Sequence, residues 1–359
     1  MDHPSYEQVI LDVNRCAGRL EHIRQCYLHR TDDDDEPPPE DLEDQRDLEG
    51  FNSSDDDDDD DNPHSIDDHD CDQDRENKTA LISGECNVSN EEEEKCERIA
   101  KDLQYQRKLK KKLAKLIVNL LTKKPHLHYY QGFHDVCLTY MIIYGEQEAF
   151  KKLDEIVDSH FSIFMQPTMA ETQEFLNLIP MILGLHDQRV GKFLEEAEVG
   201  TIFALSWVIT WFSHVIPNER DVETIFAHLE RTDDPHMILY LCAEIVLYKK
   251  DELLRLEPEM STVHHFLCQV PRKEKLPIDE LLQKAVTSFQ RWPPEYVKQQ
   301  LDQYRKDKLR VHNYNFVKSF AQNFLPLLAS IVSSPRSRTA IVVFVIASTL
   351  ALQFDRWTR

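Results

Sequence analysis

The sequence predicts an all-α protein built from many helices. Only 8 of its 359 residues are glycine, and 41% of them are hydrophobic. After residue 97 the apolar positions recur every three or four residues instead of alternating, which is the spacing of helices with one buried face. A chain of this length and composition can fill a sizeable hydrophobic core.

The acidic charge of the chain is concentrated in one segment. The formal net charge is -23, yet residues 31–98 alone hold 30 Asp and Glu against 5 Lys and Arg, a local charge of -25 that leaves about +2 for the remainder. That remainder has no basic stripe, so we expect no nucleic-acid partner. The acidic segment includes seven consecutive aspartates, Asp55 to Asp61. Such a composition cannot offset the entropy of folding, and we expect a disordered insert at residues 31–90.

This acidic tract has two interpretations. Runs of like charge usually repel one another and stay solvated, which favours a spacer. The alternative is a lure for basic partners or for Ca²⁺.

The first helix is expected at residues 6–25. One face of it carries apolar residues at helical spacing, and Arg15 points the opposite way; the apolar positions are Tyr6, Val9, Ile10, Val13, Ala17, Leu20 and Ile23. A second helix is expected to open at Glu91 with four glutamates and to end in lysines before Pro125, an arrangement that suits the helix dipole. A loop and an apolar helix from Val136 to Tyr144 follow.

The rest of the chain is expected to form consecutive helices separated by prolines, namely Pro167, Pro180, Pro217, Pro235, Pro258, Pro271 and Pro293. Within it, Val199 to Pro217 carries aromatic residues at i, i+4 and i+8, interrupted by polar residues. We interpret this stretch as a buried core helix, the central one of the domain.

The stretch from Thr339 to Phe354 is expected to anchor the chain in a membrane. It has no charged residue over 16 positions, and arginines flank it on both sides. Sixteen residues span about 24 Å as a helix, which thinner bilayers with snorkelling arginines accommodate. The alternative is a terminal core helix, but such a helix normally keeps a polar face.

The cellular setting is predicted from the cysteines and the N-terminus. The 8 cysteines form no CxxC pair, and most lie in helix-like apolar patterns, which is typical of reduced thiols. The chain opens without a basic region followed by an apolar run, so no cleaved signal peptide is expected. We therefore expect the folded part to face the cytosol.

Two motifs in this sequence resemble those of TBC domains. The run Val9-Ile10-Leu11-Asp12-Val13-Asn14-Arg15 resembles the IxxDxxR motif, and Tyr129-Tyr130-Gln131-Gly132 resembles the YxQG motif. The later run from Glu198 to Trp207 and the stretch from residue 97 to about 290 are also similar to the family. The resemblance implies an all-helical fold that activates a Rab-family GTPase in its GTP form. Together with the apolar C-terminal segment, it implies a tail-anchored protein of the endoplasmic reticulum membrane that acts in vesicle transport of the early secretory pathway.

The resemblance also implies the catalytic residues. GTP hydrolysis spreads negative charge over the phosphate oxygens, and Arg15 would stabilise that charge as an arginine finger. Gln131 would orient the attacking water. Asp12 would hold the Arg15 guanidinium in its working rotamer, although a plain surface ion pair is an equally open interpretation. GTP and Mg²⁺ belong to the GTPase, so we expect no cofactor and no metal of the chain's own, and no stand-alone enzymatic reaction.

The residues beside Gln131 are expected to support it. Tyr130 and Gly132 belong to the same motif, and Asp135 lies near a helix N-terminus, where the dipole favours a carboxylate, so we interpret it as structural. His134 with Asp135 raises the alternative of a metal-dependent phosphohydrolase, but no second set of ligands has the required spacing. His264 and His265 are interpreted in the same way, as packing residues.

The predicted organisation is therefore a finger helix of a truncated TBC domain at 1–30, the acidic insert at 31–90, the helical body at 91–308, a linker at 309–338 and the transmembrane anchor at 339–354. The insert separates Arg15 from Gln131 by 116 positions, but loop-closure entropy grows only slowly with length. The leading alternative is a membrane-tethered scaffold that binds a Rab with weak or no activation.

Overall fold

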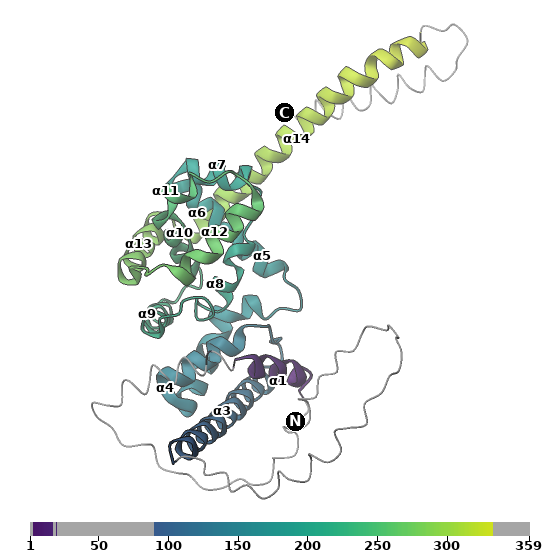
Figure 1. The fold of residues 1–359 in the computed structure, drawn as a ribbon. Helices are drawn as coiled ribbons and strands as arrows, with labels where there is room; N and C mark the ends of the chain where they lie inside the picture. The colour runs from purple at the N-terminus through teal and green to yellow at the C-terminus, as the bar shows by residue number, and fades with distance from the viewer. Residues whose placement is uncertain (1–2, 17–18, 20–89, 333–359) are drawn as a thin grey trace, which may run out of the picture. The chain divides into compact units, whose positions relative to one another are not determined.

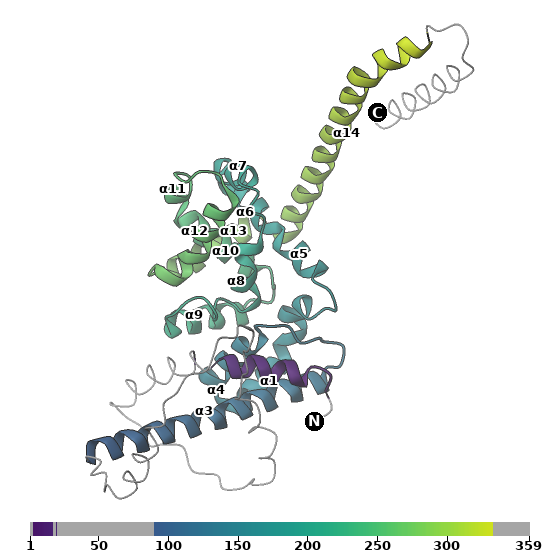
Figure 2. The ribbon, with the colours of Figure 1, turned by 45° about the vertical axis from the view of Figure 1, so that its right-hand side comes forward.

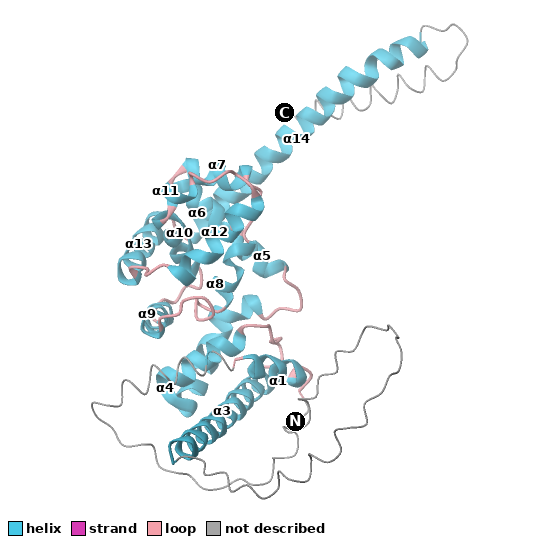
Figure 3. Ribbon diagram, in the orientation of Figure 1, coloured by secondary structure: helices cyan, strands magenta, loops and turns pink. Residues whose placement is uncertain are grey.

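The computed structural model describes residues 3–16, 19 and 90–332, and all the regular elements among them are helices (Figure 3). In chain order these are α1 (Tyr6–Arg15), α3 (Asn90–Lys123), α4 (Phe133–Ile156), η1 (Val157–Phe161), η2 (Ser162–Phe164), α5 (Ala170–Leu176), α6 (Leu178–His186), α7 (Gln188–Glu196), η3 (Ile202–Ala204), α8 (Leu205–Ile209), α9 (Glu219–Glu230), α10 (Met237–Tyr248), α11 (Lys250–Leu253), α12 (Met260–Lys273), α13 (Ile278–Arg291) and α14 (Pro294–Val332). The all-α prediction is confirmed for this part of the chain.

The chain divides into two units. The first comprises residues 1–12 and 115–359, and the second comprises residues 13–114. Within the second unit, the ammonium group of Lys110 donates a hydrogen bond to the carbonyl oxygen of Asn14 at 3.1 Å. The helix expected to open at the four glutamates is present as α3, which begins at Asn90.

The core of the first unit is organised around α10. This helix is buried at every position from Met237 to Val246, and both α6 and α13 pack against it (Figures 1 and 2). Its sequence is apolar on all sides, as expected of a helix with neighbours around it. The one acidic residue on it, Glu244, accepts a hydrogen bond from the hydroxyl of Ser288 on α13 at 2.6 Å, which satisfies part of a buried carboxylate.

A row of aromatic side chains connects α4 to α9. Tyr130 contacts Phe133 with ring centroids 5.5 Å apart, Phe133 contacts Phe161 at 5.9 Å, Phe161 contacts Trp211 at 4.6 Å, and Trp211 contacts Phe226 at 5.3 Å. All but Tyr130 are almost completely buried. Offset and edge-on aromatic contacts at these distances stabilise the fold by more than the burial of their apolar area alone would do.

The prediction of one central helix from Val199 to Pro217 is wrong in its geometry. The stretch forms η3 and α8 and then leaves the helix at Thr210, and the central helix is α10. Trp211 has φ +48° and Phe212 has φ +66°. The amide of Phe212 bonds to the carbonyl of Trp207, and that of Trp211 to the carbonyl of Val208, which is the Schellman pattern that ends a helix. The burial of Phe203, Trp207 and Trp211 is as predicted.

Two of the prolines expected to separate helices lie inside them. Pro180 is the third residue of α6, where the backbone amide needs no partner, and Pro271 lies in the last turn of α12. The predicted boundary at 308/309 falls inside α14, which continues to Val332. The side chains of Arg305 and Lys308 hold the first part of α14 through ion pairs with Glu174 and Glu195.

Some predicted segments lie outside the described residues. They are most of the acidic insert and the whole of the expected anchor, Thr339 to Phe354. Among the helices that are described, none has the length and apolarity needed to cross a bilayer.

Histidines that are buried or partly buried make the stability of this fold depend on pH. Burial lowers the pKa of His160, whose Nε2 donates to the carbonyl of Thr232 at 2.8 Å, and burial likewise lowers the pKa of His186, His228 and His236. As the pH falls below the unfolded pKa of about 6.5, the unfolded chain takes up protons that the folded chain resists, so stability is lost.

We therefore predict that the melting temperature falls less between pH 7.5 and pH 5.5 in the His160→Gln variant than in the parent. The glutamine amide can still donate a hydrogen bond to the carbonyl of Thr232. His265→Gln, at an exposed histidine on α12, is the matched control and should follow the parent. Thermal unfolding at a series of pH values measures both. Equal pH dependence in the parent and His160→Gln would contradict the prediction.

Candidate functional site

Gln131, one of the two residues predicted to act directly in GTPase activation, lies on the loop between α3 and α4, which we call the finger loop (residues 124–132). Gln131 is exposed at its end, whereas Gly132 and the first residues of α4 are buried. The backbone amide of His128 donates to the carbonyl of Met165 at 2.9 Å, and that of Phe133 donates to the carbonyl of Tyr130 at 3.2 Å. Backbone hydrogen bonds therefore hold the loop in place, while the side chain of Gln131 is exposed to solvent.

The two tyrosines of the loop make different contacts. The hydroxyl of Tyr130 donates to the carbonyl oxygen of Ile209, at the end of α8, at 2.7 Å. Burial raises the pKa of this hydroxyl well above its usual range, and the nearby Cys137 and Asp135 raise it further, so it remains a donor at physiological pH. The hydroxyl of Tyr129 donates to Oδ2 of Asp12 on α1 at 3.0 Å.

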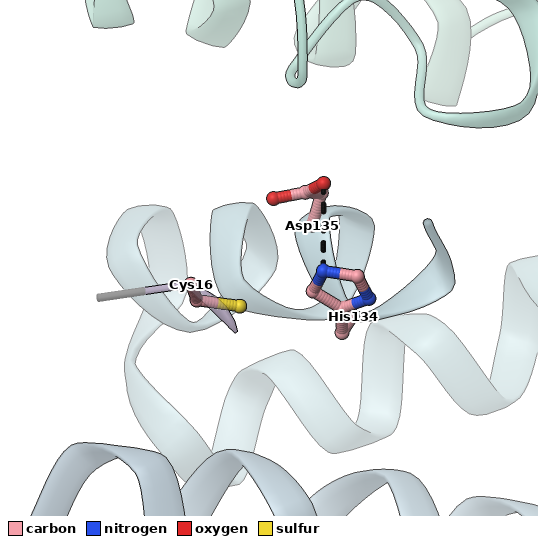
Figure 4. A group of neighbouring side chains, drawn as sticks. All are labelled: Cys16, His134 and Asp135. Carbon is pink, nitrogen blue, oxygen red and sulfur yellow. Dashed lines mark ion pairs between the residues drawn. The ribbon is translucent and has the colours of Figure 1, made fainter. Parts of the chain in front are cut away.

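A polar network continues from Tyr129 into α4. Because the single proton of its hydroxyl goes to Asp12, Nδ1 of His134 must donate to the Tyr129 oxygen, at 3.1 Å. The other ring nitrogen of His134, Nε2, lies 3.6 Å from Oδ2 of Asp135 (Figure 4). Nδ1 of His214 donates to the same Asp135 oxygen at 3.0 Å. Hydrogen bonds therefore join Asp12, Tyr129 and His134 in one set and Asp135 and His214 in another, and the ring of His134 and the carboxylate of Asp135 lie within ion-pair distance of each other.

Gly132 is required by its conformation and its surroundings. The backbone of Gly132 has φ +111°, a conformation that residues with a side chain rarely adopt. A Cβ atom at this position would also lie only 3.0 Å from Cγ2 of Thr210. The close approach of this backbone to Ile209 and Thr210 places the finger loop directly on the turn that follows α8. The predicted supporting role of Gly132 thus has a physical basis.

Asp12 and Asp135 have partners that the sequence did not indicate. Asp12 is fully buried and accepts from Tyr129, a residue 117 positions away. Asp135, expected near a helix start, is in the first turn of α4 and is bound by His214. His134 and Asp135, which raised the alternative of a metal site, therefore have protein partners here. His264, on α12, faces Cys268 one turn further on.

Arg15 is the last residue of α1, and its side chain is exposed. It belongs to the second unit, whereas Gln131 belongs to the first. The predicted pairing of Arg15 with Gln131, and that of Arg15 with Asp12, therefore stay predictions.

Comparison with known proteins places this site in a family. The family model described as Rab-GTPase-TBC domain matches residues 60–254. This range is more than half of the chain and contains the finger loop and the turn after α8, but not Arg15.

The curated relatives agree with the family model. The chain is 38% identical over 186 residues to TBC1 domain family member 20 of Homo sapiens and of Bos taurus, which covers 52% of this chain and 45% of the relative. It is 30% identical over 168 residues to GTPase-activating protein gyp10 of Schizosaccharomyces pombe, covering 46% of this chain and 45% of that protein. The matched part of the chain thus spans somewhat under half the length of these relatives.

We predict that Gly132→Ala destabilises the fold by about 1–3 kcal/mol, because it combines a strained φ with a contact that forces Thr210 or the loop to move. Gly145→Ala is the matched control, since Gly145 has φ +75° but nothing within 4 Å of its Cβ position. Chemical denaturation of both variants measures the difference. A loss no larger for Gly132→Ala than for Gly145→Ala would show that the contact with Thr210 costs nothing.

Proposed function

The chain belongs to the Rab-GTPase-TBC domain family, and from this we propose that it is a GTPase-activating protein for a Rab-family GTPase. The observation that carries the proposal is the exposed Gln131 on a finger loop whose neighbours are buried and hydrogen-bonded. An exposed amide at a fixed position can reach into the active site of a partner. The activating role stated in the name of the gyp10 protein supports the same proposal.

The chemistry proposed for Gln131 is to orient water. Its side-chain amide can accept a hydrogen bond from the attacking water and donate one toward the phosphate. GTP and Mg²⁺ are supplied by the GTPase, so the chain contributes side chains in trans and carries out no reaction alone. A loop that is already held in place favours this role, because the entropy of fixing it is lost on folding and does not add to the activation barrier.

The chemistry proposed for Arg15 is to stabilise charge. Its guanidinium keeps its charge at any physiological pH and offers a planar set of donors that matches phosphate oxygens, which lysine does not. An arginine finger is worth about 10³ to 10⁵ in rate in GTPase systems. What supports Arg15 is the IxxDxxR-like motif and its exposure at the end of α1. Asp12, in the same motif, is proposed to help orient it.

The finer parts of the proposal concern location and substrate. We propose a Rab of early secretory traffic and attachment to the endoplasmic reticulum membrane through residues 339–354. What supports the attachment is the uncharged run of 16 residues between arginines. Its length suits a thin bilayer.

We predict that Arg15→Ala lowers GTPase activation by about 10³-fold and that Gln131→Ala lowers it by about 10²-fold or more, since it removes an orienting contact. The measurement is single-turnover GTP hydrolysis by a panel of Rab GTPases with the parent and each variant. Arg255→Ala and Gln299→Ala, at exposed positions of the first unit, are the matched controls.

Three outcomes of this experiment are informative. Acceleration that is lost in both finger variants and kept in both controls supports the proposal. No acceleration of any Rab by the parent, with binding retained, leaves the scaffold alternative. Acceleration that is indifferent to both finger substitutions means that other residues carry the chemistry.

For the anchor, we predict that deleting Thr339–Arg359 moves the protein from the membrane pellet to the supernatant, because the deletion removes the uncharged run. Fractionation of cells that express the full chain and the deleted chain measures this. A deleted chain that stays in the pellet would contradict the anchor.

A further inference from the structure

His214 lies on the turn after α8 and makes one contact with the finger-loop region. Its Nδ1 donates to Oδ2 of Asp135 at 3.0 Å. The side chain of His214 is 54% exposed, whereas that of Asp135 is 4% exposed. A surface histidine thus reaches inward to a carboxylate that is almost completely shielded from water.

The carboxylate of Asp135 depends on such donors. A buried carboxylate is costly unless its oxygens accept hydrogen bonds. Nε2 of His134 also lies near this oxygen, at 3.6 Å, which is farther than the 3.0 Å that separates it from Nδ1 of His214. Removing His214 takes away one hydrogen bond that fixes the carboxylate of Asp135 in the first turn of α4.

The turn that carries His214 also holds the finger loop at a second point. The hydroxyl of Tyr130 donates to the carbonyl of Ile209 at 2.7 Å, at the start of this turn. The backbone amide of His214 in turn lies 3.4 Å from the hydroxyl oxygen of Thr210, whose methyl group supports Gly132.

Gln131 therefore lies between two attachments to one turn. Tyr130, directly before Gln131, is attached through its hydroxyl to Ile209. On the other side of Gln131, Gly132 contacts Thr210 and Asp135 accepts a hydrogen bond from His214. The sequence indicated Tyr130, Gly132 and Asp135 as supporting residues, but not His214.

We propose that His214 is a positioning residue for GTPase activation, which acts through its Nδ1–H bond to Asp135 to hold the finger loop and Gln131 in place. The proposal rests on the proposed function, because it concerns the same site. His214 need not touch the GTPase or the nucleotide. Its loss should therefore lower turnover and leave the affinity for the GTPase almost unchanged, since misplacing a group by about 1 Å can cost up to about 10²-fold in rate.

Substitution by asparagine or by glutamine distinguishes the roles of the two ring nitrogens of His214. In His214→Asn the side-chain NH₂ takes the place of Nδ1 and can still donate to Asp135, whereas in His214→Gln the amide lies nearer the position of Nε2. We expect His214→Asn to retain activation and His214→Gln to lose about tenfold or more in kcat, with KM changed by less than about twofold. His265→Gln is the matched control, because His265 is also exposed and lies on α12, outside the finger loop.

The same experiment is repeated in a Gln131→Ala background. If His214 acts only through Gln131, adding His214→Gln to Gln131→Ala lowers kcat no further. A further loss equal to that of the single variant would overturn the proposal. Activity retained in His214→Gln and lost in His214→Asn would also overturn it, since that pattern assigns the role to Nε2 and to a direct contact with the partner.

A second measurement needs no GTPase. Amide hydrogen exchange over residues 126–136 should be faster in His214→Gln than in the parent, in His214→Asn and in His265→Gln, because the finger loop opens more often. Unchanged exchange in His214→Gln overturns the proposal whether or not the chain activates a GTPase. Faster exchange in a chain that accelerates no Rab would support the role of His214 in holding the loop while the proposed function fails.

Discussion

The surroundings of the finger loop depend on one backbone feature, the left-handed conformation of Trp211 and Phe212. A bulky residue in this region costs about 1–3 kcal/mol and persists only where the surrounding structure compensates. Here the compensation is visible, because Trp211 is buried between Phe161 and Phe226 in the aromatic row. The turn that results ends α8. It brings the carbonyl oxygen of Ile209 and the methyl group of Thr210 against the finger loop, and the imidazole of His214 against Asp135 in the first turn of α4.

This arrangement couples packing to position. The ring of Tyr130 is part of the aromatic row, and its hydroxyl binds the carbonyl of Ile209. A change that loosened the row at Trp211 would therefore move both the turn and the loop that it supports, even though Trp211 is remote in sequence from Gln131. Interiors packed at this density transmit such shifts because they contain little free space.

The fold class and the loop that carries Gln131 could be predicted from the sequence, whereas the contacts that surround this loop could not. Helical periodicity was sufficient for the all-α fold, and the motif around Gln131 placed this residue in a loop before an apolar helix, where it is found. The break after α8 was missed because Trp211 occupies the position where glycine usually announces the end of a helix, and its spacing from Phe203 and Trp207 suggests that the helix continues. His214 was missed for the same reason, since on a continuous helix nothing would direct its ring toward Asp135. The contact between Asp12 and Tyr129 joins residues 117 positions apart, and no local pattern encodes it.

The polar network from Asp12 to His214 explains why an exposed glutamine needs so much buried support. A glutamine side chain has three rotatable bonds, so its end can be placed accurately only if the backbone that carries it is fixed. Apolar packing alone would fix the depth of the loop but would tolerate sliding, because dispersion contacts are not directional. Hydrogen bonds to Asp135 and from Tyr130 are directional, and their partners lie on the same rigid turn. Buried polar groups are costly when unpaired, so they favour one loop conformation over its neighbours. The role that we propose for Gln131 requires that selectivity, because a water-orienting amide must be placed accurately.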